Sequence, residues 1–187
     1  FLQPAAHDAG CSLGSALLVK HNILRRKERE INLTPYLGLE FTNNEIKKTL
    51  DQSNIKYQYC KDISLKTANI LSEGKLVAWF QGRDEWGPRA LGSRSILADP
   101  TRKEMKNIIN KKVKHREEFR PFAPSVTLED ASKFFDIKIE SPFMLFVVPV
   151  LNTAKEKIPS VVHVDGTARP QTVNKKDNPL FYELLKN

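Results

Sequence analysis

The chain has 187 residues, of which 40% are hydrophobic, and it carries a formal net charge of +8 with an isoelectric point near 9.5. This length and apolar content suffice for one folded domain, or for one domain with a piece of another. The positive charge favours an anionic partner, which is nucleic acid, a membrane surface or a phosphorylated small molecule. No apolar run approaches the ~18 residues of a membrane span, and the first residues lack the features of a signal peptide.

Two distant cysteines, Cys11 and Cys60, have neither a metal-binding spacing nor the pattern of a disulfide framework. We therefore expect a reducing, cytoplasmic protein. The sequence does not begin with Met, which suggests a piece of a longer protein.

The first forty residues predict a helix followed by a linker. Small residues after Asp8 favour the start of a helix, which Asp8 would cap. Asp8 beside His7 is also a candidate metal ligand, although one such pair is common by chance. Residues 21–40 are charged and unpatterned, so a domain boundary is expected there.

Residues 42–80 alternate between helix and strand patterns. We expect a helix that begins near Thr42, a short strand at 55–59, a helix from 63 to 71 that stops at Gly74, and a buried strand at 76–80. A glycine- and arginine-rich loop follows this last strand. Ligands of open α/β sheets bind beyond the carboxyl ends of the strands, so this loop is a candidate site.

The loop over residues 82–95 contains Arg83, Arg89 and Arg94. It differs from a phosphate-binding P-loop, because Ser93 stands where the lysine belongs and Pro88 lacks an amide donor. We therefore expect the arginine side chains to bind phosphate, since the planar guanidinium can bind it through two hydrogen bonds. The neighbouring acids, Asp84 and Glu85, would organise the arginines or hold Mg²⁺, and structural pairing is the favoured role.

A second group of cations precedes a proline-framed apolar run. A strand is expected at 95–98 and an amphipathic helix at 104–113, whose lysines form a solvated face. Lys114, Arg116 and Arg120 then follow in an expected extended segment. Pro121 and Pro124 forbid helix there and stiffen the support.

The remaining sequence predicts a strand at 124–127, a helix at 128–135, a central strand at 143–150, a hairpin at 161–173 and a helix at 178–186. The hairpin would place five polar residues on one face, and an ordinary solvated edge strand remains the alternative. These residues are His163, Asp165, Thr167, Arg169 and Gln171.

Three ordered blocks, residues 82–100, 119–124 and 163–173, closely resemble the C-terminal part of the NodU/CmcH-type carbamoyltransferases. Residues 4–10 are similar to the segment just upstream in that family, so the resemblance covers nearly the whole chain. It implies an α/β class with a YrdC-like twisted mixed sheet and flanking helices, truncated at the C-terminus. Residues 1–26 would be the tail of an N-terminal actin/hexokinase-like transferase domain, with a linker to about 40 and an incomplete YrdC-like domain over 41–187.

In this family the YrdC-like domain makes carbamoyl-adenylate from carbamoyl phosphate and ATP, and the N-terminal domain transfers the carbamoyl group to a hydroxyl acceptor. Mg²⁺ is a possible companion of ATP, whereas Fe²⁺ or another divalent metal would belong only to the full-length protein. The resemblance implies that the adenylate site is lined by Arg89, Lys114, Arg120 and Arg169. It implies Arg83, Arg94, Arg116 and His163 as neighbours of that site and Asp8 as a metal ligand.

The resemblance also limits what this chain is expected to do alone. The metal-binding histidines of the family lie upstream of residue 1, and a segment whose Ser and Asn help to close the adenylate site lies beyond residue 187. We therefore expect the missing N-terminal domain as an intramolecular partner. The fragment should show the cations of the site but work poorly or not at all by itself.

A basic nucleic-acid-binding module is the competing interpretation. Trp86, Phe119 and Phe122 lie among the cations, as stacking platforms for bases would. However, the cations concentrate in loops and in the expected hairpin, and the aromatic residues flank glycine and proline. The sequence therefore favours small-molecule substrates over nucleic acid or a membrane.

Overall fold

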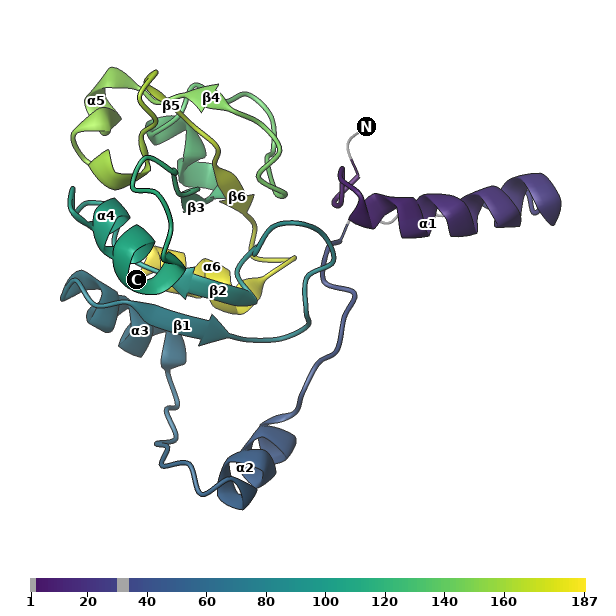
Figure 1. Cartoon of the computed structure of the whole chain (residues 1–187), viewed down its shortest axis with the longest axis horizontal. Coiled ribbons are helices and arrows are strands. Elements are labelled where there is room, and N and C mark those ends of the chain that lie inside the picture. Colours follow the sequence, from purple (N-terminus) through teal and green to yellow (C-terminus); the bar gives the residue numbers. More distant parts are fainter. Residues whose placement is uncertain (1–2, 30–33) are drawn as a thin grey trace.

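The computed structural model of the chain describes residues 3–29 and 34–187. Helix α1 (Ala9–Leu18), continued by a π-helical turn at Val19–Ile23, projects from a body formed mainly by residues 63–187 (Figure 1). Helix α2 (Asn43–Gln52) also stands away from this body, and neither α1 nor α2 contains a buried residue. The candidate site therefore depends on the body and on the segments that connect it to these helices.

The body contains short helices and strands in alternation. Its first half comprises α3 (Ile63–Ser72), β1 (Val77–Phe80), β2 (Arg94–Leu97), and α4 (Met105–Ile109) with a π-helical turn at Asn110–Lys114. Its second half comprises β3 (Ser125–Thr127), a 3-10 helix at Leu128–Lys133, β4 (Val148–Pro149), α5 (Asn152–Lys155), a 3-10 turn at Pro159–Val161, β5 (Thr167–Ala168), β6 (Gln171–Val173) and α6 (Pro179–Lys186).

The strands of the described residues form three two-stranded sheets. Strands β1 and β2 are antiparallel, β3 and β6 are parallel, and β4 and β5 are antiparallel. The α/β class is thus confirmed, and both strand orientations are present. The expected mixed sheet is nevertheless divided into separate pairs, because the strands are only two to four residues long.

Two apolar clusters stabilise the body. One lies around α5 and includes Phe135, Val150, Ile158 and Ala168. The other joins α3, β1, β6 and α6 through buried Trp79, Val173, Phe181 and Leu184. Strand β6 contributes to the second cluster while its partner strand β3 contacts the first, so the β3–β6 pair connects the two halves.

Several predicted elements are confirmed with their local causes. The Thr42 hydroxyl accepts a hydrogen bond from the Glu45 amide, and the Glu45 carboxylate accepts one from the Thr42 amide, which forms a capping box at the start of α2. Gly74 follows α3 with a φ of +81°, as a helix stop requires. The Asn178 side chain accepts a hydrogen bond from the Phe181 amide and caps α6.

Three other strand predictions were wrong or were met only in part. Residues 55–59 contain no strand, and Ile55 and Tyr59 are exposed. Strand β1 exists, but Phe80 is 53% exposed, since β1 pairs only with β2. The expected central strand at 143–150 is reduced to the two residues of β4.

The predicted hairpin at 161–173 was also wrong. Its Asp165-Gly166 turn is present, since the His163 amide donates to the Thr167 carbonyl at 2.8 Å. Beyond this turn, β5 pairs with β4 and β6 pairs with β3, so residues 161–173 do not share one polar face. Gln171 instead is almost fully buried.

Two further local expectations differ from the structure. Asp8 makes no side-chain capping bond and its side chain is 96% exposed, so it does not cap α1. The segment after Lys114 is not extended, because His115 adopts a left-handed conformation and residues 118–119 form a turn.

The expected linker packs against the arginine loop. Tyr36 forms an antiparallel bridge with Glu85, and the Gly38 amide donates to the Asp84 carbonyl at 3.0 Å. The Trp86 amide also donates to the Pro35 carbonyl at 2.6 Å. Residues 34–40 therefore support the loop, whereas the expected boundaries of the domains stay predictions.

Substitution of Gly92 tests how tightly the loop is packed against α6. Gly92 has a φ of +97°, and a Cβ at this position would lie 2.2 Å from the Phe181 ring. We expect Gly92→Ala to lower the free energy of unfolding by about 3 kcal/mol, through backbone strain and overpacking. Gly14→Ala is the matched control, because a Cβ there meets nothing within 4 Å. Equal urea midpoints for both variants would contradict this packing.

Candidate functional site

The carboxylate of Glu85 organises the loop between β1 and β2. Its Oε1 accepts hydrogen bonds from the backbone amides of Leu91, Ser93 and Arg94 at 2.9, 2.7 and 3.1 Å. The amides that a bound phosphate would need are therefore occupied by a side chain of the protein. Binding of phosphate by the arginine side chains of the loop stays a prediction.

The carbonyl groups of the same turn are held from three other parts of the chain. The Leu91 carbonyl accepts hydrogen bonds from the Tyr36 hydroxyl at 2.8 Å and from the Gln171 amide nitrogen at 2.9 Å. Trp79 Nε1 donates to the Gly92 carbonyl at 2.9 Å. Burial, with the nearby charge of Glu85, raises the pKa of Tyr36 to about 12, so its hydroxyl remains a donor at neutral pH.

Two of the predicted cations, Arg94 and Arg83, are bound to other groups of the protein. The Arg94 guanidinium donates to the Gln81 and Gly82 carbonyls, lies 2.6 Å from the Asp84 carboxylate and covers the Phe80 ring. Arg83 binds outside the loop, at 3.4 Å from the Glu40 carboxylate and 3.2 Å from the Gly38 carbonyl.

Asp84 therefore pairs with an arginine side chain, as expected, whereas Glu85 binds backbone amides. Arg94 is bound within the loop, and Arg83 joins the loop to residues 34–40.

Arg89 and Arg169 form the clearest candidate anion site. Arg89 lies exposed at the tip of the loop, and Arg169 lies between β5 and β6. Burial and the positive charge of Arg89 both lower the pKa of Arg169. Within residues 3–29 and 34–187, the buried Nε of Arg169 has no hydrogen-bond partner. Two cations that repel each other, one with an unused donor, favour a bound anion.

The loop that carries Lys114, Arg116 and Arg120 is fixed by Asn110, which is fully buried. Asn110 Nδ2 donates to the Glu118 and Arg120 carbonyls, and its Oδ1 accepts from Arg116 Nε at 2.8 Å.

The three cations of this loop differ in their surroundings. Arg116 lies over the Phe122 ring, with its guanidinium carbon 4.9 Å from the ring centre. Arg120 is half exposed and forms a 2.8 Å ion pair with Glu117, whereas Lys114 is exposed. Among the described residues, no hydrogen bond or ion pair joins Lys114 or Arg120 to the Arg89–Arg169 pair. The convergence of all four therefore stays a prediction.

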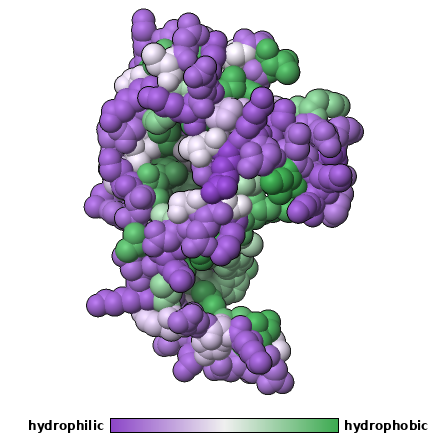
Figure 2. All heavy atoms as spheres, turned by 90° about the vertical axis from the view of Figure 1, so that its left-hand side faces the viewer, coloured by the Kyte–Doolittle hydropathy of each residue, from purple (hydrophilic) through white to green (hydrophobic). Residues whose placement is uncertain are grey.

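A hollow of about 610 Å³ lies directly beside this loop. Residues 122–125, which follow Arg120, line it together with residues of α3, β2, α4 and α6. Figure 2 looks onto this side of the molecule and shows apolar residues in a hollow between hydrophilic ones. Its volume lies in the range of small-molecule sites, and its lining provides apolar contacts with polar groups such as Ser125 and Lys106.

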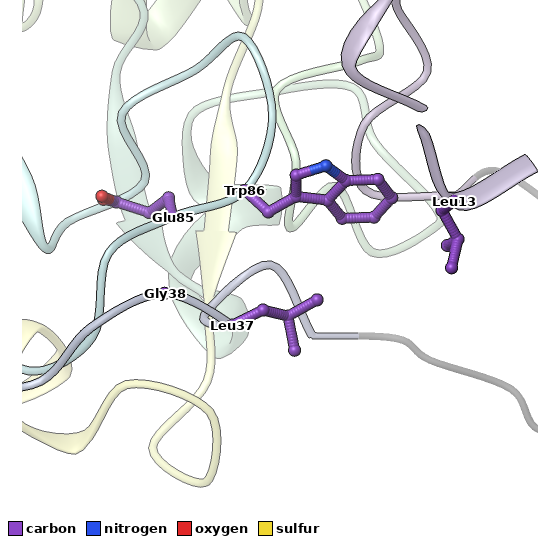
Figure 3. A pocket seen from close by; sticks show the side chains of 5 residues that line it. All are labelled: Leu13, Leu37, Gly38, Glu85 and Trp86. Atoms are coloured by element: carbon purple, nitrogen blue, oxygen red, sulfur yellow. The ribbon is translucent and has the colours of Figure 1, made fainter. Parts of the chain in front are cut away.

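A second pocket, of about 370 Å³, lies between α1, residues 37–38 and the start of the loop (Figure 3). Leu13, Leu37, Gly38, Glu85 and Trp86 line it, and none of the candidate cations does. Trp86 Nε1 donates to the Ala9 carbonyl at 3.2 Å, and the Glu85 side chain points away from the indole. This pocket belongs to the contact between α1 and the loop and is not an anion site.

The two remaining candidate residues, His163 and Asp8, each lie beside one polar neighbour. His163 Nδ1 lies 3.1 Å from the Thr167 hydroxyl in the turn before β5, and Asp8 lies 3.9 Å from His7. Within the described ranges, no group of three or more His, Cys, Asp or Glu side chains could hold a metal ion. Asp8 as a metal ligand therefore stays a prediction.

Sequence reasoning missed two residues that hold the site together. Tyr36 lies in a stretch that was interpreted as an unpatterned linker, and Asn110 lies in a helix interpreted only for its apolar face. A polar residue directly after the buried Ile109 was the available signal for Asn110. Tyr36 had no such signal, because its partners lie 55 and 142 residues away.

Comparison with known proteins identifies the family. The family model "Carbamoyltransferase C-terminus" matches residues 68–187. The chain belongs to the carbamoyltransferase family. It is 44% identical to nodulation protein NolO of Bradyrhizobium diazoefficiens over 191 residues, with 99% of this chain and 35% of NolO covered.

Two further relatives are similar over all or part of the chain. The 3'-hydroxymethylcephem-O-carbamoyltransferase of Streptomyces clavuligerus is 36% identical over 185 residues, with 99% of this chain and 34% of that protein covered. Nodulation protein U of Rhizobium tropici is 48% identical over 122 residues, which is 65% of this chain and 21% of that protein.

This carbamoyltransferase segment thus spans about a third or less of the length of these relatives. Among the described residues, no helix has the length and apolar character that a membrane crossing needs.

Asn110 offers a test of how the second cation loop is held. We expect Asn110→Ala to lower the free energy of unfolding by about 2–3 kcal/mol, because it removes three hydrogen bonds and leaves buried groups unpaired. Asn107→Ala is the matched control, since Asn107 is exposed on α4. Urea denaturation compares the two variants, and a loss below about 0.5 kcal/mol for Asn110→Ala, as expected for a surface site, would contradict this role.

Proposed function

We propose that this chain provides the carbamoyl-adenylate-forming part of an O-carbamoyltransferase and binds carbamoyl phosphate and ATP. The observation that carries the proposal is the Arg89–Arg169 pair, in which two cations repel each other and a buried donor has no partner among the described residues. Membership of the carbamoyltransferase family supplies the class of reaction.

The chemistry joins two anionic substrates. One water molecule first hydrolyses carbamoyl phosphate to carbamate and inorganic phosphate, with release of a proton. A carbamate oxygen then attacks the α-phosphorus of ATP, the bond to the β-phosphate oxygen breaks, and pyrophosphate leaves. Such a displacement depends on in-line positioning and charge neutralisation more than on a protonating side chain, so guanidinium and ammonium groups suit it.

The two cation loops would take different parts of the substrates. Arg89 and Arg169 would hold phosphate oxygens from the side of the β1–β2 loop. Lys114 and Arg120 would hold carbamoyl and phosphate oxygens at the hollow, whose apolar lining would receive the adenine ring. Arg116 would orient this loop through Asn110 and Phe122, to which it is already bound. Mg²⁺ would accompany the triphosphate.

The reaction would be completed outside this chain. The name of the Streptomyces clavuligerus relative specifies a hydroxymethyl group as carbamoyl acceptor of that protein. We propose a hydroxyl acceptor here too, bound by an N-terminal domain of the same longer protein, where any Fe²⁺ or other divalent metal would lie. The reaction would take place in the cytoplasm.

Titration calorimetry of this chain with ATP, with and without carbamoyl phosphate, tests the proposal. We expect ATP to bind more tightly when carbamoyl phosphate is present, and the binding to depend on the base. A nucleic-acid module would instead bind RNA or DNA, with an affinity that falls steeply as salt rises. One observation favours this alternative: Phe119 is 75% exposed beside Arg120, where its ring could stack on a base. Binding of RNA without binding of ATP would overturn the proposal.

Single substitutions test the assigned cations. In a full-length carbamoyltransferase that carries this segment, we expect Arg89→Ala, Lys114→Ala or Arg120→Ala to abolish carbamoyl-phosphate-dependent exchange of pyrophosphate into ATP. Each lost charge-assisted contact costs ~1.5–3 kcal/mol, or about ten- to hundredfold in binding. Lys103→Ala is the control, because Lys103 is an exposed cation that precedes α4. Near-normal exchange in all three variants would refute the assignment.

A further inference from the structure

Glu85 binds the loop in a way that its neighbours do not. One oxygen of its carboxylate accepts hydrogen bonds from three backbone amides, so a full negative charge is held by donors that have fixed positions. Bonds of this kind are about twice as strong as those between neutral groups. The Glu85 side chain thereby closes a ring with the backbone, from residue 85 to residue 91.

Arg89 lies in the part of the loop that this ring encloses. Residues 88–90 are exposed, and no hydrogen bond ties them to the described part of the chain. The tip is therefore positioned by its two ends. At one end, residues 84–86 pair with residues 35–38, and at the other the Glu85 carboxylate holds residues 91–94.

The opposite side of the candidate site is linked to the same turn. Gln171 follows Arg169 by two residues in β6, and its side chain donates to the Leu91 carbonyl at 2.9 Å. Ser125 of β3 in turn donates to the Gln171 side-chain oxygen at 2.9 Å. Leu91 thus donates its amide to Glu85, and its carbonyl accepts from Gln171, two residues after Arg169. These two bonds link the segments that carry Arg89 and Arg169.

We propose that Glu85 is a positioning residue that holds Arg89 opposite Arg169 for binding of the carbamoyl phosphate phosphoryl group. This inference rests on the proposed function and adds a residue that acts through Arg89 without touching the substrate. Removal of the carboxylate leaves three amides of the turn without their acceptor and frees the tip.

The experiment first reads the loop itself, with no substrate present. We expect Glu85→Ala to speed hydrogen exchange of the Leu91, Ser93 and Arg94 amides about tenfold, as a loss of roughly 1.4 kcal/mol requires. Backbone ¹⁵N relaxation should show increased motion at Arg89. Added formate, which can occupy the vacated position, should restore both, whereas sodium chloride at equal ionic strength should not.

Two more variants keep the test decisive. Glu85→Gln retains the shape and one oxygen acceptor but not the charge, so it should give an intermediate effect even where Glu85→Ala folds poorly. Glu73→Gln is the matched control, because Glu73 is an exposed acid paired with Lys75 beside Gly74. Unchanged exchange and relaxation in both Glu85 variants would overturn the proposal.

A double-mutant cycle measures whether Glu85 affects carbamoyl phosphate binding through Arg89. We expect Glu85→Ala to raise the dissociation constant of carbamoyl phosphate about tenfold in the wild-type background and to have little effect in the Arg89→Ala background. Full additivity of the two substitutions would refute positioning of Arg89 by Glu85. Absence of carbamoyl phosphate binding to the wild-type protein would instead refute the proposed function, and the loop measurements would still decide the role of Glu85.

Discussion

The carboxylate of Glu85, bound to three amides of one turn, is the interaction on which the candidate site depends. A buried or half-buried carboxylate is costly unless donors replace its water, and the left-handed Gly92 allows the turn to present three donors to it. The same turn exposes carbonyls in the opposite direction. These carbonyls bind Tyr36, Trp79 and Gln171, which come from the linker, β1 and β6. One short turn therefore joins segments that are remote in sequence.

This polar junction also explains why short sheets are sufficient. Two-stranded sheets bury little apolar surface, and here they are joined by side-chain to backbone bonds and by two small apolar clusters. Gln171 and Thr172, polar residues of β6, are buried because each is bound to a neighbouring segment. The candidate cations project from this framework. Arg83, Arg94, Arg116 and Arg120 form hydrogen bonds or ion pairs with other groups of the protein.

The sequence predicted what is encoded locally. Helix starts at Thr42 and Asn178 and the helix stop at Gly74 depend on residues within four positions, and they were confirmed. Strand pairing depends on contacts between segments that are distant in sequence. The hairpin at 161–173 was therefore predicted with the wrong partners, since β5 pairs with β4 and β6 pairs with β3. The motif blocks identified the family, but they could not show that Arg94 and Arg116 are bound to internal acceptors, because those bonds arise from the folded geometry.

The π-helical turn at Asn110–Lys114 has a consequence for how this site tolerates change. A π turn holds one more residue than the α-helical turn that it replaces. The extra residue lets the Asn110 carbonyl accept hydrogen bonds from the His115 and Arg116 amides, five and six positions later. A segment shortened by one residue would close an α-helical turn instead, and these two amides would lose that acceptor. The number of residues between Ile109 and His115 is thus constrained. An insertion or deletion there would damage the site more than most substitutions.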